Sequence, residues 1–328
     1  MTDDIPVFTA HDIPDLINTL PTLFGFTPED SLVAIATYGP RHRMGFRLRV
    51  DMPAMQHVGV AADQVVTHLA HQGAEGAIVI AVTDRIDVAR RLVPEVERRL
   101  GEIRPVVGVW ADGTRYWTTV EDCDPAGYPY ETSNHHLAVV QAVAAGQEIV
   151  PDRAALAAKL ETESGQRRIW LNQAGASVAQ QVAAVLATRQ ALTVAEVGMS
   201  DLAPALDAVL ARRGLTDAQA LRLAVWAMTI PVRDELWALI TPGSARDMVG
   251  VWSHVVRCAP PWISPPSLCL AGFASWLAGD GALALIAAER ALEIDPLYPM
   301  AGLLLRMLDA GMPPSSWRPF GEGRRTSA

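Results

Sequence analysis

Lysine is almost absent from this sequence. Lys159 is the single lysine among 27 basic residues, so nearly all the positive charge is carried by arginine. Two explanations stay open: codon bias in a GC-rich genome, or selection for the planar, bidentate chemistry of the guanidinium group. Codon bias is the preferred explanation because it also accounts for the high alanine content.

Cysteine is scarce as well. The chain has three cysteines, Cys123, Cys258 and Cys269, an odd number at spacings that no zinc motif uses. Few residues of metal-ligand type stand near them in the sequence, so we expect no structural metal site. Unpaired cysteines are typical of a reducing, cytosolic compartment.

Long apolar segments and a basic surface are also lacking. The longest apolar runs, such as 76–82, are far shorter than the ~20 residues that span a bilayer. The acidic start MTDDIPVFTAHD does not have the composition of a secretory signal. The net charge of −9 argues against nucleic-acid binding, which depends on neutralising phosphates. We therefore expect a cytoplasmic protein with no membrane and no nucleic-acid partner.

The first part of the chain alternates between strand and helix patterns. Five short segments have the apolar or alternating character of strands: 31–37, 44–50, 77–83, 105–110 and 115–120. Amphipathic segments with helical spacing lie between them: 13–23, 55–72 and 88–100. Asp112-Gly113 predicts a hairpin between the last two strands. Strands separated by helices of this length predict an α/β domain with a mostly parallel sheet.

The remainder of the chain predicts helices only. Capping residues or prolines precede successive helical segments: Asp152, Ser200 or Asp201, Thr216, Pro231 and Ser244. We therefore divide the chain into an α/β domain over residues 1–135 and an all-α domain over residues 136–328.

One helix pair near the end has a recognisable spacing of small residues. Gly272, Ala284, Ala291 and Pro296 stand at the offsets of a tetratricopeptide-type helix pair, in which small residues let two antiparallel helices approach closely. Three such units are usually needed for a stable array, and the sequence shows one. We therefore interpret it as a single tetratricopeptide-like pair within the helical domain.

Several polar residues lie where an α/β sheet commonly binds ligands. Asp51, Asp84 and Asp112 each follow a predicted strand, and ligands bind at the carboxyl ends of parallel strands. Carboxylates there can hold Mg²⁺ or position a sugar or phosphate. The candidate ligand-binding residues are Glu29, Asp30, Ser31, Arg49, Asp51, Asp84 and Arg233.

Structural explanations compete with several of these, whereas Asp51 has the weakest one and Arg233 has no local one. Asp84 can help to cap the following helix, Asp112 belongs to a hairpin turn, and Asp30 or Ser31 can bond the backbone at a strand start. Neither a catalytic triad nor a phosphate-binding loop is recognisable, and no catalytic residue, metal site or cofactor is predicted. The histidine pair at 135–136, with Cys123, is a weak candidate for nucleophilic chemistry.

Several motifs, in order, carry a resemblance to a known family. They are LFGFTPEDSLV from Leu23, RVDMP from Arg49, GYPY from Gly127, PVRD from Pro231, and GDGALA from Gly279 followed by Asp295-Pro296. The series resembles an actinobacterial family of uncharacterised proteins, domain-of-unknown-function family 4192, over nearly the whole chain. Phe24 stands where the family pattern has a second leucine. The resemblance implies an actinobacterial source and no activity.

The sequence favours a non-enzymatic, cytosolic protein-interaction or regulatory module that binds a protein partner through its helical domain. The alternative is a nucleotide or sugar-phosphate binding protein, or a Mg²⁺-dependent enzyme, that uses the strand ends of the first domain. Neither the oligomeric state nor a specific partner follows from the sequence.

Overall fold

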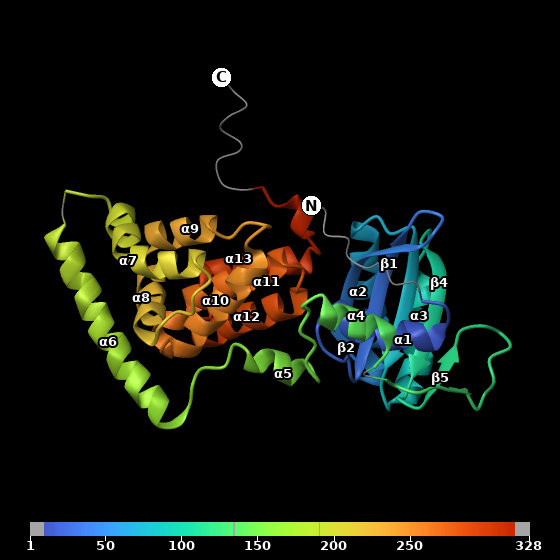
Figure 1. Cartoon of the computed structure of the whole chain (residues 1–328). Coiled ribbons are helices and arrows are strands. Elements are labelled where there is room, and N and C mark those ends of the chain that lie inside the picture. Colours follow the sequence, from blue (N-terminus) through green and yellow to red (C-terminus); the bar gives the residue numbers. More distant parts are fainter. Residues whose placement is uncertain (1–9, 134, 190, 319–328) are drawn as a thin grey trace, which may run out of the picture. The chain divides into compact units, whose positions relative to one another are not determined.

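The chain forms two compact units in a computed structural model that describes residues 10–133, 135–189 and 191–318 (Figure 1). The first unit covers Met1–Arg153 and the second Ala154–Ala328. The sequence analysis divided the chain after residue 135. That division concerns which segments fold on their own, and it stays a prediction. In the structure, α4 (Leu137–Ala144) packs against α1 (Ile13–Phe24) within the first unit.

A mixed sheet forms the centre of the first unit. Its strands run in the order β2-β1-β3-β4-β5-β6. Their bounds are β1 (Ser31–Tyr38), β2 (Arg43–Asp51), β3 (Gly76–Val82), β4 (Arg104–Ala111), β5 (Arg115–Thr118) and β6 (Tyr128–Pro129). The sequence pattern therefore identified the first five strands and missed β6, which is too short to show a period.

The prediction of a mostly parallel sheet was wrong. Among the described strands, β3 and β4 form the single parallel pair, and the other neighbouring strands are antiparallel. The reason lies in the connections. β1 and β2 form a hairpin, and the segment with α2 (Val58–His71) leads from edge strand β2 across β1 to β3. β3 consequently runs antiparallel to its neighbour β1.

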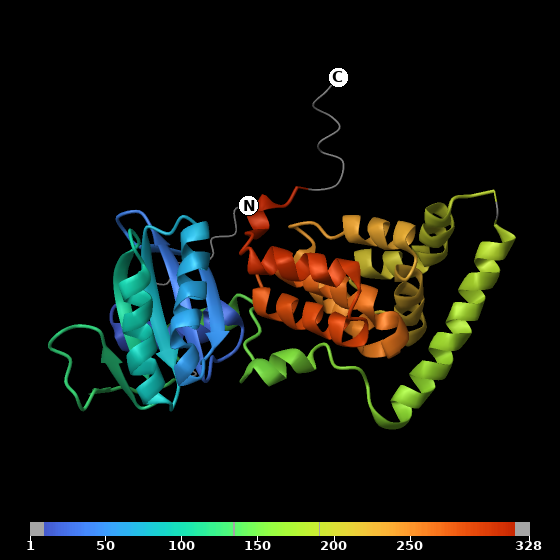
Figure 2. The ribbon, with the colours of Figure 1, turned by 180° about the vertical axis from the view of Figure 1, so that it is seen from behind.

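Helices cover both faces of this sheet (Figure 2). Alternate residues of β1 point into two separate cores. Leu32 and Ala34 pack with α2 and α3 (Ile86–Arg99), whereas Val33 and Ile35 pack with α1. β1 is buried along its first seven residues, and this two-sided burial explains its unbroken apolar sequence.

The segment between α1 and β1 reverses the chain direction at defined residues. α1 ends at Gly25, whose φ of 74° is in the left-handed region that glycine adopts without strain. Phe26 and Pro28 are buried. Asp30 has a φ of 40°, a conformation that Asn and Asp tolerate better than most residues. Each change of backbone direction thus has a suitable residue.

From Ala154 on, the described residues form helices and loops only. The helices of the second unit begin with α5 at the unit boundary and are α5 (Arg153–Ala158), α6 (Gly165–Thr188), α7 (Val194–Leu210), α8 (Asp217–Ala227), α9 (Ile230–Ala238), α10 (Ala245–Cys258), α11 (Ser264–Leu277), α12 (Gly281–Ile294) and α13 (Pro299–Asp309). Short 3₁₀ turns lie at Met55–His57, Pro261–Ile263 and Pro314–Ser316.

Local capping explains where these helices begin. Thr216 caps α8 in a capping box with Gln219, as its position predicts. The predicted start at Ser200 or Asp201 was wrong, because α7 begins earlier, at a capping box between Thr193 and Glu196. None of the helices in the described part of the chain is long and apolar enough to cross a membrane.

Gly272 lets α11 approach its neighbours closely. A Cβ atom at this position would lie 3.1 Å from the Ala287 Cβ, 3.2 Å from the Ala284 carbonyl oxygen and 2.7 Å from a Leu304 methyl group. Ala284 and Ala287 are on α12, and Leu304 is on α13. The small residues therefore mark the tightest part of a three-helix contact.

We predict that Gly272→Leu lowers the free energy of unfolding by about 1–3 kcal/mol, because the added side chain overpacks this contact. Gly302→Leu on α13 is the matched control, since its nearest neighbour would be the flexible end of Arg306 at 3.5 Å. Urea unfolding followed by circular dichroism measures both. Equal destabilisation of the two variants would contradict the close-packing explanation.

Candidate functional site

Four of the predicted site residues lie together at one edge of the sheet. Ser31, at the start of β1, is directly opposite Asp51 on β2 and Val82 on β3. The start of β1 and the ends of β2 and β3 meet there because β1 runs antiparallel to both. We call Asp30, Ser31, Arg49, Asp51, Thr83 and Arg85 the strand-end cluster.

Asp30 bonds two other members of the strand-end cluster. Its carboxylate accepts hydrogen bonds from the Thr83 hydroxyl at 2.7 Å and from two nitrogens of Arg85 at 3.0 and 2.9 Å. Burial alone would raise the pKa of Asp30, but the bonds from Thr83 and Arg85 outweigh it and lower the pKa below its usual value. The Asp30 carboxylate is therefore ionised near neutral pH, and 55% of its side chain remains exposed.

Arg85 also binds the loop that follows β2. It donates to the carbonyl oxygens of Met52 at 2.7 Å and Pro53 at 3.2 Å. The Met52 amide donates in turn to the Asp30 carbonyl at 2.8 Å. One guanidinium group thus joins three segments of chain, which is the kind of bidentate binding that lysine does not reproduce.

A second ion pair lies beside the first. Arg49 donates to the Ser31 hydroxyl at 2.8 Å and pairs with Asp51 at 2.5 Å. The Ser31 hydroxyl donates to the Glu29 carbonyl. Ser31 is completely buried, so it is placed as a structural hydrogen-bonding group and is closed to substrate.

The other predicted residues lie differently. Glu29 and Asp84 are exposed at the same edge of the sheet, and Asp84 accepts through its carbonyl the amide of Ile86 at the start of α3. Arg233 belongs to the second unit, where it pairs with Asp234 at 2.8 Å and donates to the Tyr298 hydroxyl at 3.4 Å. The strand-end cluster is thus made from Asp30 and the start of β1, the end of β2 and the segment after β3.

Asp112 and His136 each have a structural partner. The Asp112 carboxylate accepts bonds from the amides of Thr114 and Arg115, as a hairpin turn requires. His136 lies 3.1 Å from the Asp15 carboxylate on α1. The hydrogen bond with His136 lowers the pKa of Asp15.

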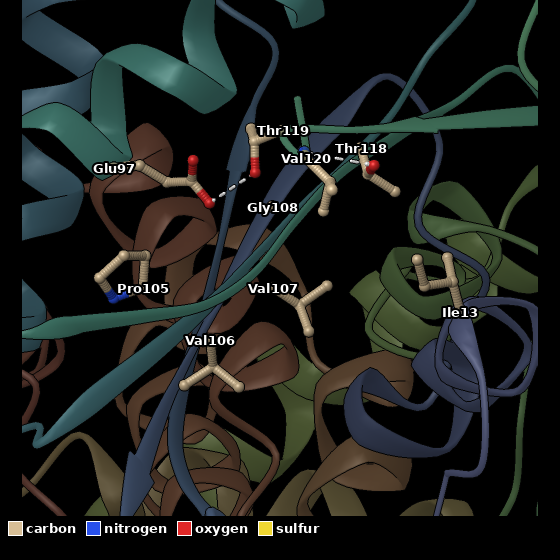
Figure 3. Close-up of a pocket in the computed structure, with 9 residues that line it drawn as sticks. All are labelled: Ile13, Glu97, Pro105, Val106, Val107, Gly108, Thr118, Thr119 and Val120. Carbon is tan, nitrogen blue, oxygen red and sulfur yellow. Dashed lines mark hydrogen bonds between the residues drawn. The ribbon is translucent and has the colours of Figure 1, made fainter. Parts of the chain in front are cut away.

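A small pocket lies beside β4 (Figure 3). It has a volume of about 280 Å³ and opens where β5 is too short to pair with the start of β4. Val106, Val107 and Val120 line it, and Glu97 accepts a hydrogen bond from Thr119 at 3.1 Å. Burial raises the pKa of Glu97, and the bond from Thr119 offsets part of the rise. The pocket is mainly apolar, and Glu97 is the one charged residue among those that line it.

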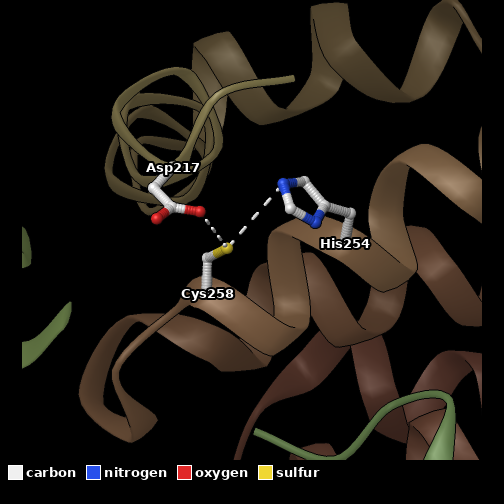
Figure 4. Close-up of side chains that lie close together, drawn as sticks. All are labelled: Asp217, His254 and Cys258. Carbon is white, nitrogen blue, oxygen red and sulfur yellow. Dashed lines mark hydrogen bonds between the residues drawn. The ribbon is translucent and has the colours of Figure 1, made fainter. Parts of the chain in front are cut away.

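A third group of chemically active side chains lies in the second unit (Figure 4). The Cys258 Sγ lies 3.6 Å from Asp217 Oδ1 and 3.8 Å from His254 Nε2. His254 and Cys258 are one turn apart on α10, and Asp217 is the first residue of α8. We call these three residues the Cys258 cluster.

Cys258 is not placed to act as a nucleophile. Its side chain is buried, and burial together with the nearby Asp217 carboxylate raises the pKa of the thiol to about 12. A reactive thiolate needs the opposite surroundings, with positive charge and access to solvent. Cys258, Cys269 and Cys123 are all free thiols.

The comparisons with known proteins give the family. A model of a domain of unknown function, DUF4192, matches residues 14–315. The chain belongs to the DUF4192 family. No curated protein and no solved structure matches it. The match to the family model covers most of both units of this DUF4192 chain. The description of the family gives no activity.

Two sets of residues were missed by the sequence analysis of this DUF4192 chain. Thr83 and Arg85 complete the strand-end cluster, and their signal was their position directly after a buried strand, beside Asp84. His254 and Cys258 have an i,i+4 spacing on a predicted helix, which places both on one helix face. Asp217 carries no such signal, because its approach to Cys258 depends on how α8 packs on α10.

We predict that Asp30→Asn lowers the free energy of unfolding at pH 7 by about 1 kcal/mol, a modest value because both partners are partly exposed. Asparagine keeps the left-handed backbone and the bond from Thr83, so the loss reports the charge. A lowered pKa means that this contribution is present above about pH 3.9 and disappears as the pH falls through the folded-state pKa.

Urea unfolding from pH 7 to pH 3 measures this effect. The difference between the wild-type protein and Asp30→Asn should shrink below pH 4. Asp51→Asn serves as the control and should cost less, since 81% of the Asp51 side chain is exposed. A difference that stays constant down to pH 3 would show that the Asp30 charge does not stabilise the fold.

Proposed function

We propose that this protein is a protein-interaction module and that its partner binds the second unit where the start of α6 meets the end of α10. The observation that carries this proposal is that three large apolar side chains are exposed on the two segments that meet there. Ile169, Trp170 and Trp262 are 60%, 50% and 52% exposed. We call this region the α6–α10 corner.

The backbone at the α6–α10 corner is firmly held. Arg168 on α6 donates to the carbonyl oxygens of Arg257 at 3.1 Å and Ala259 at 3.0 Å. Arg257 pairs with Glu163 at 2.8 Å. The segments that carry Trp170 and Trp262 are therefore joined by several bonds, so these side chains project from an ordered surface.

Exposed tryptophan on an ordered surface is typical of binding sites. Tryptophan is enriched among the residues that contribute most to protein–protein affinity, because it buries a large area and loses little conformational entropy. The arginines at the corner, Arg168 and Arg257, are bonded within the chain, so the exposed apolar side chains are what a partner can use. A partner with an apolar contact surface fits this chemistry.

The helix pairing of the second unit supports the same function. We propose that α11 and α12 form a tetratricopeptide-like pair, because Gly272 faces Ala284 and Ala287 across a close contact. Stacked helix pairs of that type commonly present extended surfaces to other proteins.

The site of action that we propose is the cytosol of an actinobacterium. The three free cysteines fit a reducing compartment, and the arginine and alanine bias fits a GC-rich genome. Partners of other classes are not favoured: the acidic net charge of −9 opposes nucleic acid.

The strand-end cluster gives little support to the alternative function, a nucleotide or sugar-phosphate binding protein or a Mg²⁺-dependent enzyme. A ligand-binding site needs groups that are free to bind, and the Asp30 and Arg49 charges are neutralised by Arg85 and Asp51. We propose that this cluster holds β1, β2 and the start of α3 together, and that it is not a nucleotide, sugar-phosphate or Mg²⁺ site.

We predict that Trp170→Ala with Trp262→Ala abolishes partner binding without unfolding the protein. Removing a central tryptophan typically costs at least ~2 kcal/mol of binding free energy, which is roughly 30-fold in affinity. Capture of the tagged full chain from its native lysate, followed by mass spectrometry, measures recovery of a stoichiometric partner.

Leu210→Ala is the control, because Leu210 is 81% exposed at the end of α7, away from the corner contacts. It should retain the partner. Recovery of the wild-type chain alone would contradict the proposed function, and equal recovery of a partner with the double variant would contradict the proposed surface.

A further inference from the structure

We propose that the Cys258 cluster is a zinc site in which Cys258, His254 and Asp217 supply three ligands and water the fourth. This proposal stands apart from the proposed function, since it concerns a different chemistry and different side chains. Thiolate, imidazole and carboxylate groups are the three types of zinc ligand in proteins. A mixed set of this kind suits zinc better than the hard cations Mg²⁺ and Ca²⁺, which prefer oxygen.

The distances from the Cys258 sulfur to the other two donor atoms fit tetrahedral coordination. With ordinary zinc bond lengths, a tetrahedral angle separates sulfur from a nitrogen or oxygen ligand by about 3.6 Å. The Cys258 Sγ lies 3.6 Å from Asp217 Oδ1 and 3.8 Å from His254 Nε2. All three donor atoms lie within 4.8 Å of one another. Figure 4 shows the Asp217 carboxylate and the His254 ring both directed at the sulfur.

The three ligands are held by regular structure. His254 and Cys258 share one face of α10, where their spacing of four residues brings their side chains together. Asp217 is fixed by the capped start of α8 and by Arg167, which donates to the same Oδ1 atom at 2.9 Å. A hydrogen bond from an outer residue is a common means of orienting a metal ligand.

The surroundings also allow an ion to enter. Cys258 is buried, whereas Asp217 and His254 are partly exposed, so the cluster is open on their side. Asp217 and Glu163 supply the neighbouring negative charges, and Arg167, Arg168 and Arg257 supply the positive ones. When Zn²⁺ binds, the zinc–sulfur bond replaces the S–H bond of Cys258 and the proton leaves to solvent.

A metal here would join two helices. Asp217 begins α8, and Cys258 ends α10, directly before the segment that carries Trp262. Zinc would therefore fix the end of α10 relative to α8. Structural zinc sites stabilise a fold by such cross-links between separate segments.

Titration with Zn²⁺ alone tests the proposal. The full chain, first treated with a chelator, is titrated in a calorimeter in two buffers of different ionisation enthalpy. We expect one equivalent of Zn²⁺ to bind and about one proton to be released. Cys258→Ser and His254→Ala should each weaken binding more than the ~10- to 100-fold that loss of an outer hydrogen-bond partner costs.

Cys269→Ser is the matched control, because Cys269 is also buried but lies outside the cluster. It should bind Zn²⁺ as the wild-type chain does. Circular dichroism of each variant without metal establishes that it folds. Unchanged affinity in folded Cys258→Ser, or no saturable Zn²⁺ binding by the wild-type chain, would overturn the proposal.

Cobalt gives a readout that needs no variant. Co²⁺ in the wild-type chain should show a cysteine-to-cobalt charge-transfer band and the intense visible bands of tetrahedral coordination, and Zn²⁺ should displace it. A Co²⁺ spectrum without the cysteine band would mean that Cys258 keeps its proton and only bonds Asp217. That outcome would also overturn the zinc site while leaving the proposed protein interaction untouched.

Discussion

The burial of β1 on both faces is the constraint on which the first unit depends. Leu32 and Ala34 face one helical layer, and Val33 and Ile35 face the other, so α1, α2 and α3 each take their place from this strand. The backbone N–H and C=O groups of a strand buried in this way cannot bond water, so the strand needs a partner strand on each side. β2 and β3 supply those partners, and both lie antiparallel to β1.

The strand-end cluster follows from this arrangement. The chain enters the buried strand through a tight backbone turn at Asp30, and it does so beside the ends of β2 and β3. Arg85 and Arg49 neutralise the carboxylates gathered there. The acids that resemble a ligand site in the sequence are thereby paired with arginines, and the zinc site that we propose lies in the helical unit instead.

Local patterns could be predicted from the sequence, and spatial neighbours could not. The apolar run from Ser31 and the capping residue Thr216 determine their own structure, so β1 and the start of α8 were predicted correctly. Strand direction depends on the order of the strands in the sheet. The position of β1 between β2 and β3 makes β3 antiparallel to β1, and no local sequence pattern predicts that order. The link between Asp30 and Arg85 was likewise invisible, as was the approach of Asp217 to Cys258, because each joins segments far apart in the chain.

The second unit combines an ordered scaffold with exposed aromatic side chains, and the central claim is that a protein binds it there. Hydrogen exchange of the full chain, measured alone and in complex with its captured partner, tests this claim most directly. The claim predicts slower exchange on binding in the segments 165–172 and 259–264, around Trp170 and Trp262, with little change at the strand-end cluster. Slower exchange at the strand-end cluster, with no change in the two helical segments, would contradict it.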